Sequence, residues 1–320
     1  MLYLNLSKEF NPMNSQSHET ISFEAFTFSG GEPHIKLDYN FNQVQRECET
    51  GNWCNVWISH RINSFEDLGL LMVAVDALRG TYPIDDLYLY LPYFPGARQD
   101  RRMVNGEPLT VKVYADIINS LGFKAVKIVD PHSDVAPALI DNCFAIDNHR
   151  FVNKCLELMP FTDVDMSILD SAAKPHFNLI SPDAGSNKKM KDLAKSIAED
   201  YYPFNLIKCD KTRDVSTGKI TGFDVYADDL GGLPSIIVDD ICDGGGTFIG
   251  LAEQLINKNC GKLYLIVTHG IFNGGFNILQ KYFDGIFTTD SFYRGDNGNW
   301  RMRSGKDVSD ILTVIQLKEL

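Results

Sequence analysis

The sequence of 320 residues has no apolar stretch long enough to cross a lipid bilayer. In the apolar region from Leu68 to Leu78, the uninterrupted run covers only 68–75, whereas a membrane-spanning helix needs about 20 such residues. The first ten residues, MLYLNLSKEF, have no basic segment followed by a long apolar one and already include Glu9. We therefore expect neither a transmembrane helix nor a secretory signal.

Cysteine patterns that would indicate a disulfide framework or a zinc site are also missing. The seven cysteines are an odd number at irregular spacing, positions 48, 54, 143, 155, 209, 242 and 260. They form no CxxC pair and no Cys–His spacing typical of zinc. We interpret them as reduced thiols, which predicts a cytoplasmic location.

Basic residues are few relative to acidic ones. The chain has 30 Lys and Arg against 42 Asp and Glu, a formal net charge of −12. A field of this sign repels polyanions, so nucleic acid and anionic membranes are not expected as partners. A small anion can still bind where basic side chains gather locally.

The length and composition are those of a globular protein with more than one domain. Apolar residues make up 44% and charged residues 22%, and 320 residues suit two domains of about 150 residues each. The order strand, polar loop, helix recurs in both halves. The sequence predicts an N-terminal α/β domain over 1–150, a C-terminal α/β domain over 151–295, and a C-terminal tail, 296–320, that could pack on the first domain.

Apolar β-rich runs alternate with segments of helical period, which favours an α/β fold with parallel sheets. Helical stripes at i, i+3, i+4, i+7 begin at Leu68, Val111, Met190 and Phe248, and the first follows a Ser64…Asp67 capping pattern. The expected strands are Asn55–Ser59, Leu87–Leu91, Ala125–Val129, Phe177–Ile180, Ser235–Val238, Lys262–Val267 and Gly285–Phe287.

The segment VDDICDGGGT, 238–247, carries the clearest chemical signal. It follows a predicted strand and opens a predicted helix, and its three glycines let successive backbone N–H groups turn around an anion. Asp239 and Asp240 would repel that anion unless they accept hydrogen bonds from sugar hydroxyls or hold a metal. Together these features indicate a phosphorylated sugar, although a plain glycine turn with solvated acids is the alternative. Without a following Lys, and with Ile249, the segment fits neither a P-loop nor GxGxxG.

Three further motifs follow predicted strands. PGARQDRR, 95–102, brings three arginines together, and guanidinium groups suit a polyphosphate, although a solvated turn is the alternative. His132 in VDPHSD and Asp183 in SPDAG could ligate a cation, or simply cap helices. The segment KCDKTR, 208–213, is predicted to be a mobile basic loop that closes over a transferring phosphoryl group, with a surface hairpin as the alternative.

These motifs occur in an order that resembles the ribose-phosphate pyrophosphokinase family along most of the chain. The matching stretches are FSGGEPHIKL, CNVWISHRIN with LLMVAVDALR, LPYFPGARQDRR with GEPLTVK, VDPHSD, SPDAG, CDKTRD and VDDICDGGGT. SPDAG and VDPHSD are weak signals alone. ARQDRR together with VDD…GGGT, roughly a domain apart, is specific.

The resemblance implies transfer of the β,γ-pyrophosphoryl group of ATP to the anomeric hydroxyl of ribose 5-phosphate. It also implies two phosphoribosyltransferase-like α/β domains with parallel sheets, related by a pseudo-twofold axis, and Mg²⁺ as cofactor. Because residues of the family reach the adenine from a neighbouring subunit, it implies a homo-oligomer, a dimer or hexamer. Two alternatives are a phosphoribosyltransferase with the same loop and a non-catalytic regulatory relative.

The resemblance also gives a role to residues at matching positions. These are Asp239, Asp240, Asp243, Gly244, Gly245, Gly246 and Thr247 for ribose 5-phosphate; Arg98, Gln99, Phe28 and Glu32 for ATP; His132 and Asp183 for Mg²⁺; and Lys211 and Arg213 for catalysis. The sequence departs from the family pattern at Gly30, Met103 and Gly244, where the family usually has polar side chains.

Overall fold

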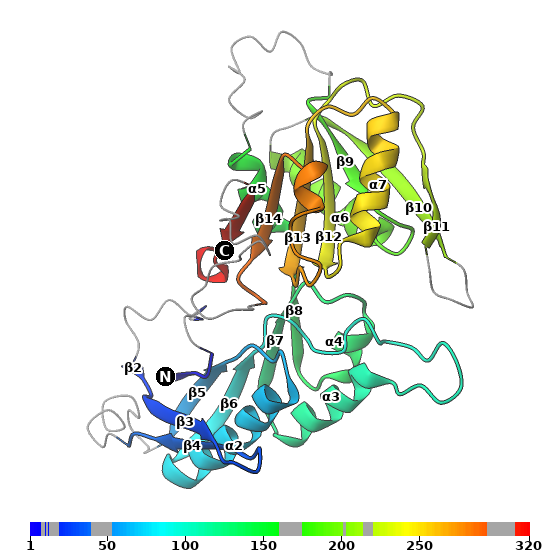
Figure 1. Ribbon diagram of the computed structural model, residues 1–320. Coiled ribbons are helices and arrows are strands. Elements are labelled where there is room, and N and C mark those ends of the chain that lie inside the picture. Colours follow the sequence, from blue (N-terminus) through cyan, green and yellow to red (C-terminus); the bar gives the residue numbers. More distant parts are fainter. Residues whose placement is uncertain are drawn as a thin grey trace. The chain divides into compact units, whose positions relative to one another are not determined.

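The computed structural model describes residues 1–7, 10, 12, 19–39, 53–159, 175–200, 203–213, 220–292 and 311–320. The chain divides into two compact units, one built mainly on Met1–Asp147 and the other mainly on Asn148–Asp290 (Figure 1). Short C-terminal pieces complete both, and 316–319 belongs to the first unit. Each unit contains a parallel sheet, which confirms the predicted fold class. The boundaries at 150 and 295 and the pseudo-twofold axis stay predictions.

The first unit is a six-stranded sheet in the order β2-β1-β5-β6-β7-β8, in which every neighbouring pair is parallel. Its helices α2, α3 and α4 lie on one face of the sheet, where they enclose the main apolar core of the unit (Figure 1). The elements are β1 Leu2–Asn5, β2 Glu19–Thr20, β5 Cys54–Ser59, α2 Phe65–Thr81, β6 Ile84–Tyr90, α3 Thr110–Ser120, β7 Ala125–Val129, α4 Val135–Leu139 and β8 Cys143–Ile146.

An antiparallel hairpin, formed by β3 (Phe23–Thr27) and β4 (Pro33–Leu37), packs against α2 in the same unit. The contact is close at Gly69 of α2, where an added Cβ would lie 2.8 Å from the Pro33 ring. The missing side chain of Gly69 therefore lets β4 approach the helix.

The second unit has a seven-stranded sheet in the order β11-β10-β9-β12-β13-β14-β15, parallel except for the pair β10–β11. Helices α5 and α6 pack on one face and α7 on the other, so two apolar clusters enclose the sheet. The elements are α5 His149–Glu157, β9 Phe177–Ser181, α6 Asn187–Asp200, β10 Phe204–Arg213, β11 Ile220–Val225, β12 Ser235–Cys242, α7 Gly246–Asn257, β13 Leu263–Gly270, a 3₁₀ turn Leu279–Lys281, β14 Gly285–Thr289, β15 Leu312–Ile315 and a 3₁₀ turn Leu317–Glu319.

The predicted core stripes explain most of the packing. Leu68, Leu71 and Val75 of α2 are buried, whereas Met72 of the same predicted stripe is 44% exposed. Ser64 caps this helix, because its hydroxyl accepts a hydrogen bond from the backbone N–H of Asp67 at 3.1 Å. All seven predicted strands are present, most of them one to four residues longer than their apolar runs.

The expectations about membrane-spanning helices and about the cysteines can be compared with the structure. Within the described part of the chain, no helix is long and apolar enough to cross a membrane. Five cysteines, 143, 155, 209, 242 and 260, are free thiols, but Cys54 forms a disulfide. The prediction of reduced thiols is therefore wrong at Cys54, because irregular spacing along the sequence does not exclude a bond between cysteines that the fold brings together.

Candidate functional site

The glycine segment in the second unit lies where β12 ends and α7 begins (Figure 1). Gly245 is the N-cap of α7 with φ +79°, and no side chain caps the helix there. An added Cβ at Gly245 would also meet Leu279 at 3.1 Å, so this position requires glycine for two reasons. The flanking Gly244 and Gly246 are exposed, and an added Cβ would touch nothing there. The start of α7 thus presents backbone N–H groups on an open surface, which suits an anion.

The two acids before this segment lie near the end of β12. The backbone N–H of Asp240 donates to Asp239 Oδ1 at 3.0 Å, and the Asp240 side chain is buried. Burial raises the pKa of Asp239 well above its usual value, and the charges of Asp240 and Asp183 raise it further. The acidic side chains of Asp239, Asp240 and Asp183 therefore lie close together at the carboxyl ends of β12 and β9. A cation or hydroxyl donors would relieve their mutual repulsion.

The raised pKa of Asp239 predicts a pH-dependent stability. Above about pH 4 the unfolded chain ionises this carboxyl while the fold resists ionisation, so the wild type loses stability as the pH rises from there through the folded pKa. Asp239→Asn removes this loss and keeps an oxygen for the Asp240 N–H. We expect the variant to unfold at a higher temperature than wild type at pH 8 and at nearly the same temperature at pH 4.

Calorimetric melting of both proteins at the two pH values measures this effect. An equal difference at pH 4 and pH 8 would contradict the assigned pKa direction, because a pH-independent gain comes from packing.

Lys211 and Asp183 form an ion pair in the second unit, and both side chains are largely shielded from solvent. Burial alone would raise the pKa of the Asp183 carboxyl, but the hydrogen bond and charge of Lys211, with the backbone N–H groups of Ser186 and Gly185, hold it below its usual value. The carboxylate therefore stays ionised at neutral pH. The structure brings together two residues to which the sequence gave different roles, cation binding and catalysis.

The predicted basic loop is wrong for 208–213, which form the last part of β10. Lys211 pairs with Phe223 of β11, and Arg213 ends the strand next to a register shift. The strand forms because Ile207 and Cys209, in alternation with polar residues, face the apolar cluster under α7. The side chain of Arg213 and the residues 214–219 lie outside the described part of the chain.

In the first unit, two predicted motifs meet at the carboxyl ends of β6 and β7. The Ser133 hydroxyl donates to Asp100 Oδ2 at 2.7 Å, which joins the loop of His132 to the loop of Arg98 and Gln99. The side chains predicted to bind ATP, Arg98 and Gln99, and the predicted metal ligand His132 are all exposed. Ser133 and Asp100 were not singled out from the sequence, although both stand inside the quoted motifs after neighbouring strands. We infer that they hold the two loops in place.

Phe28 and Glu32 lie in the turn of the β3–β4 hairpin. The backbone N–H of Phe28 donates to the Glu32 carbonyl at 2.9 Å, and the Phe28 ring lies 4.9 Å from the ring of Phe26 and 5.5 Å from that of His34. This aromatic cluster is exposed, with Phe28 at 53%. The Glu32 carboxylate lies over Gly30, where an added Cβ would meet it at 2.5 Å. Glycine at position 30 therefore lets Glu32 fold back over the turn.

The fit of the site to Mg²⁺ depends on the oxygen ligands. Among the residues that the structure describes, no group of three or more His, Cys, Asp or Glu side chains could hold a metal ion. Mg²⁺ commonly keeps several waters and binds through one or two carboxylates together with substrate phosphates. Asp183 fits such an open site in charge, because its carboxylate is ionised, but in this structure that carboxylate is paired with Lys211.

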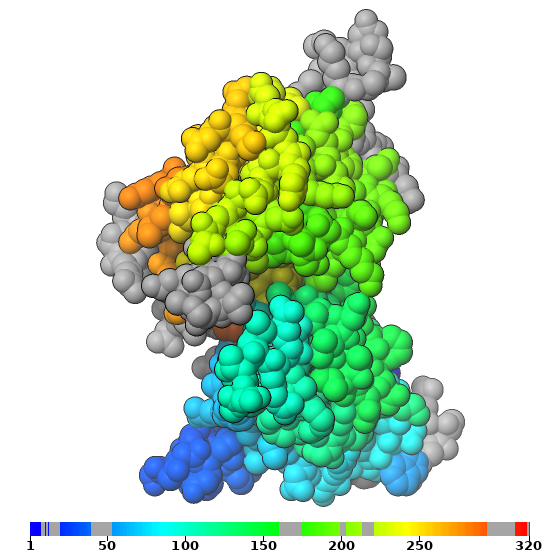
Figure 2. All heavy atoms as spheres, turned by 90° about the vertical axis from the view of Figure 1, so that its right-hand side faces the viewer, coloured from blue at the N-terminus to red at the C-terminus, as the bar shows by residue number. Residues whose placement is uncertain are grey.

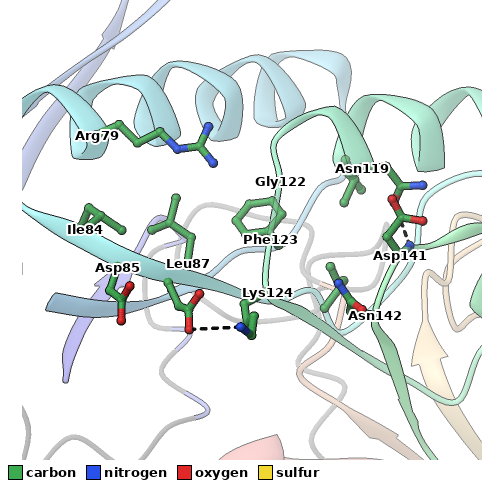
Figure 3. Close-up of a pocket in the computed structure, with 13 residues that line it drawn as sticks. Arg79, Ile84, Asp85, Leu87, Asn119, Gly122, Phe123, Lys124, Asp141 and Asn142 are labelled. Atoms are coloured by element: carbon green, nitrogen blue, oxygen red, sulfur yellow. Dashed lines mark hydrogen bonds and ion pairs between the residues drawn. The ribbon is translucent and has the colours of Figure 1, made fainter. Parts of the chain in front are cut away.

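A cavity of about 470 Å³ in the first unit lies away from these motifs (Figure 3). It is formed near the amino ends of β6 and β7, and none of the predicted site residues lines it. Its polar side chains maintain the fold: Arg79 donates to the Leu121 carbonyl at 2.6 Å, and Lys124 pairs with Asp86 at 3.6 Å. Ligands of parallel sheets bind at the opposite, carboxyl end of the strands, so this cavity is not the candidate site.

The fold and site together define a pair of phosphoribosyltransferase-like α/β domains. The structure of phosphoribosylpyrophosphate synthetase from Mycobacterium smegmatis is similar over 100% of this chain and 95% of that one, with a TM-score of 0.74 and 19% identity. No family model matches the chain. Its sequence is 30% identical over 223 residues to ribose-phosphate pyrophosphokinase of Mycoplasmopsis pulmonis, which covers 69% of this chain and 64% of that protein.

The protein of the same name from Mycoplasma genitalium is 28% identical over 275 residues, 82% of this chain and 73% of that protein. The chain thus spans less than two thirds of the M. pulmonis relative and somewhat more of the M. genitalium one. The chain belongs to the ribose-phosphate pyrophosphokinase family.

Proposed function

We propose that the protein is a ribose-phosphate diphosphokinase that transfers the pyrophosphoryl group of ATP to the anomeric hydroxyl of ribose 5-phosphate, giving 5-phosphoribosyl 1-diphosphate and AMP. This proposal rests on the carboxyl ends of the strands in the second unit, where the acids of β12, the open glycine segment and the Lys211–Asp183 pair occur together. A sugar phosphate needs hydroxyl acceptors next to an anion site, and this edge offers both.

In the proposed reaction, Asp239 and Asp240 accept hydrogen bonds from the ribose hydroxyls. Asp243 and the segment Gly244–Thr247 bind the 5-phosphate through backbone N–H groups at the start of α7. Since Gly244 provides no hydroxyl, its backbone must supply the contact that a threonine gives elsewhere in the family. The ribose is thereby held with its anomeric hydroxyl oriented for attack.

Phosphoryl transfer then requires charge stabilisation more than covalent chemistry. We assign this role to Lys211 and Arg213, whose cations stabilise the negative charge that develops on the transferred group. Because Lys211 is paired with Asp183 in the structure, it must leave that carboxylate, or share it, when it acts on the nucleotide.

Arg98 and Gln99 are proposed to bind ATP, and Phe28 and Glu32 of a second subunit to contact its adenine. The exposed Phe28 ring suits stacking on a base. The protein would then act as a homo-oligomer, a dimer or hexamer. Met103, next to the arginines, is 65% exposed, and its side chain has no polar group of the kind usual at this position in the family.

Bound Mg²⁺ would neutralise phosphate charge during transfer. Asp183 and His132 are the proposed protein ligands, of which Asp183 is ionised and oriented by the Ser186 N–H at 3.0 Å. A cytoplasmic location stays a prediction from the sequence, and the disulfide at Cys54 is not what that prediction expects.

The test is to incubate the protein with ATP, Mg²⁺ and ribose 5-phosphate and follow ³¹P resonances. We expect AMP and a new anomeric diphosphate to appear together in equal amounts. Formation of ADP would instead indicate transfer of a single phosphoryl group and would refute the proposal. Turnover only when a purine or pyrimidine base and 5-phosphoribosyl 1-diphosphate are supplied would indicate a phosphoribosyltransferase. No turnover with bound ribose 5-phosphate would indicate a non-catalytic relative.

A further inference from the structure

The position of the β10–β11 hairpin depends on a close contact with α7. An added Cβ at Gly250, in the first half of α7, would lie 2.5 Å from Cε2 and 3.3 Å from Cζ of the Phe223 ring. Real Cβ atoms do not approach a neighbour to 2.5 Å, so the ring occupies the space that any other residue at position 250 would need. The contact exists only because residue 250 is glycine.

The Phe223 ring lies next to the predicted catalytic lysine along the hairpin. Phe223 pairs directly with Lys211 across the two antiparallel strands, and directly opposed residues place their side chains on the same face. Ile207 and Cys209 of β10 and Val225 of β11 belong with Phe223 to the apolar cluster under α7. Lys211 continues this row past the end of the apolar cluster, toward Asp183.

In the described part of the chain, no strand flanks the hairpin on the outer side of β11. β11 is the edge strand of the sheet, and its side of the molecule faces the viewer in Figure 2. Among the described residues β11 pairs only with β10, and it packs against α7, where Phe223 lies over Gly250, so this contact sets where the hairpin lies relative to the helix. The same helix carries the glycine segment at its N-terminus.

The first unit contains the same arrangement. Gly69 and Gly250 are each the fifth residue of their helices, Phe65–Thr81 and Gly246–Asn257. Each glycine lies against a ring from a hairpin that carries predicted site residues: the Pro33 ring lies against Gly69, and the Phe223 ring lies against Gly250. Both hairpins therefore sit on a helix at the position where a side chain is missing.

We propose that Gly250 is a positioning residue: it lets the Phe223 ring pack directly on α7, and this contact determines the position of Lys211, which pairs with Phe223. Gly250 touches no proposed substrate and acts through the hairpin. The role of the positioned lysine in turnover rests on the proposed function, whereas the seating itself does not.

The test compares Gly250→Ala with Gly222→Ala. Gly222 precedes Phe223 on the same strand, and an added Cβ there touches nothing, so it is a matched control. The first readout is the rate of reductive methylation of the Lys211 amine, measured by peptide mass spectrometry against the exposed Lys208. We expect Gly250→Ala to raise this rate several-fold, because a displaced hairpin breaks the pair with Asp183, and Gly222→Ala to leave it unchanged.

The second readout is steady-state turnover. A displacement of about 1 Å can cost up to about 100-fold in rate, so we expect kcat of Gly250→Ala to fall about 10- to 100-fold while KM for ribose 5-phosphate changes little. Alanine is a better helix former than glycine, so thermal stability is not expected to fall in parallel. The double variant Gly250→Ala/Phe223→Leu lacks the two ring atoms Cε2 and Cζ and should recover most of both wild-type values.

Wild-type methylation and kcat in Gly250→Ala would overturn the inference, as would failure of Phe223→Leu to rescue. An equal loss of kcat, ribose 5-phosphate affinity and melting temperature would also overturn it, because that pattern reports a general loss of structure. If the wild type shows no pyrophosphoryl transfer, the proposed function fails, but the methylation rates still decide whether Gly250 seats the hairpin.

Discussion

Lys211→Ala is expected to lower turnover at least about 100-fold, which is the scale for removing one group that stabilises transition-state charge. The lysine is proposed to neutralise charge on the transferred group together with Arg213, and its neighbours cannot take its place, because Cys209 is buried and Asp210 is acidic. Steady-state rates with saturating ATP and ribose 5-phosphate measure the effect.

The structural cost of this variant should be small. Asp183 keeps the N–H donor of Ser186 after the lysine is removed, so its carboxylate is not left without a hydrogen-bond partner. Lys208→Ala is the matched control, since Lys208 is an exposed lysine on the same strand. Turnover of Lys211→Ala within a few-fold of the control would remove Lys211 from the mechanism.

Asp240→Asn is expected to weaken ribose 5-phosphate binding about 10- to 100-fold and to leave ATP binding nearly unchanged. The Asp240 side chain is buried at the end of β12, and a hydrogen bond from a sugar hydroxyl to a carboxylate is worth about 1.5–3 kcal/mol. An amide retains one acceptor oxygen but loses the charge and presents a donor to the hydroxyl. Calorimetric titration with each ligand separately measures the two affinities.

Asp192→Asn makes the same chemical change on the surface of α6 and should affect neither ligand. Equal weakening of both ligands by Asp240→Asn would contradict the assigned role, because Asp240 would then act on the nucleotide or on the site as a whole. Asp239→Asn should resemble Asp240→Asn in binding. Higher stability at pH 8 together with weaker sugar binding in that variant would be the trade-off expected of a functional acid in an unfavourable environment.

The elements with strong periodicity were predictable because their pattern follows from local geometry. The stripe from Leu68 marks α2, because burial of one helix face imposes a period of 3.6. The apolar run at Ala125–Val129 coincides with β7, because a strand inside a parallel sheet is buried on both faces. The glycine segment was also placed correctly between β12 and α7, because glycines between an apolar strand run and a helical stripe mark the connecting turn.

The residues around Lys211 show where this reasoning stops. Polar residues of 208–213 suggested a loop, but Lys208 pairs with β9, Cys209–Arg213 pair with β11, and the Cys209 side chain packs in the apolar cluster under α7. Whether such a segment forms a strand depends on neighbours that are distant in the sequence. The pairs Ser133–Asp100 and Phe223–Gly250 were missed for the same reason.

The sequence by itself determined the fold class and the chemical types at the strand ends, because side-chain period and residue chemistry are local properties of the chain. Only the tertiary structure decided that Lys211 meets Asp183 and that a ring rests on Gly250. Those contacts follow from the strand order β11-β10-β9-β12 and from the face on which α7 packs, and the local pattern of the chain specifies neither.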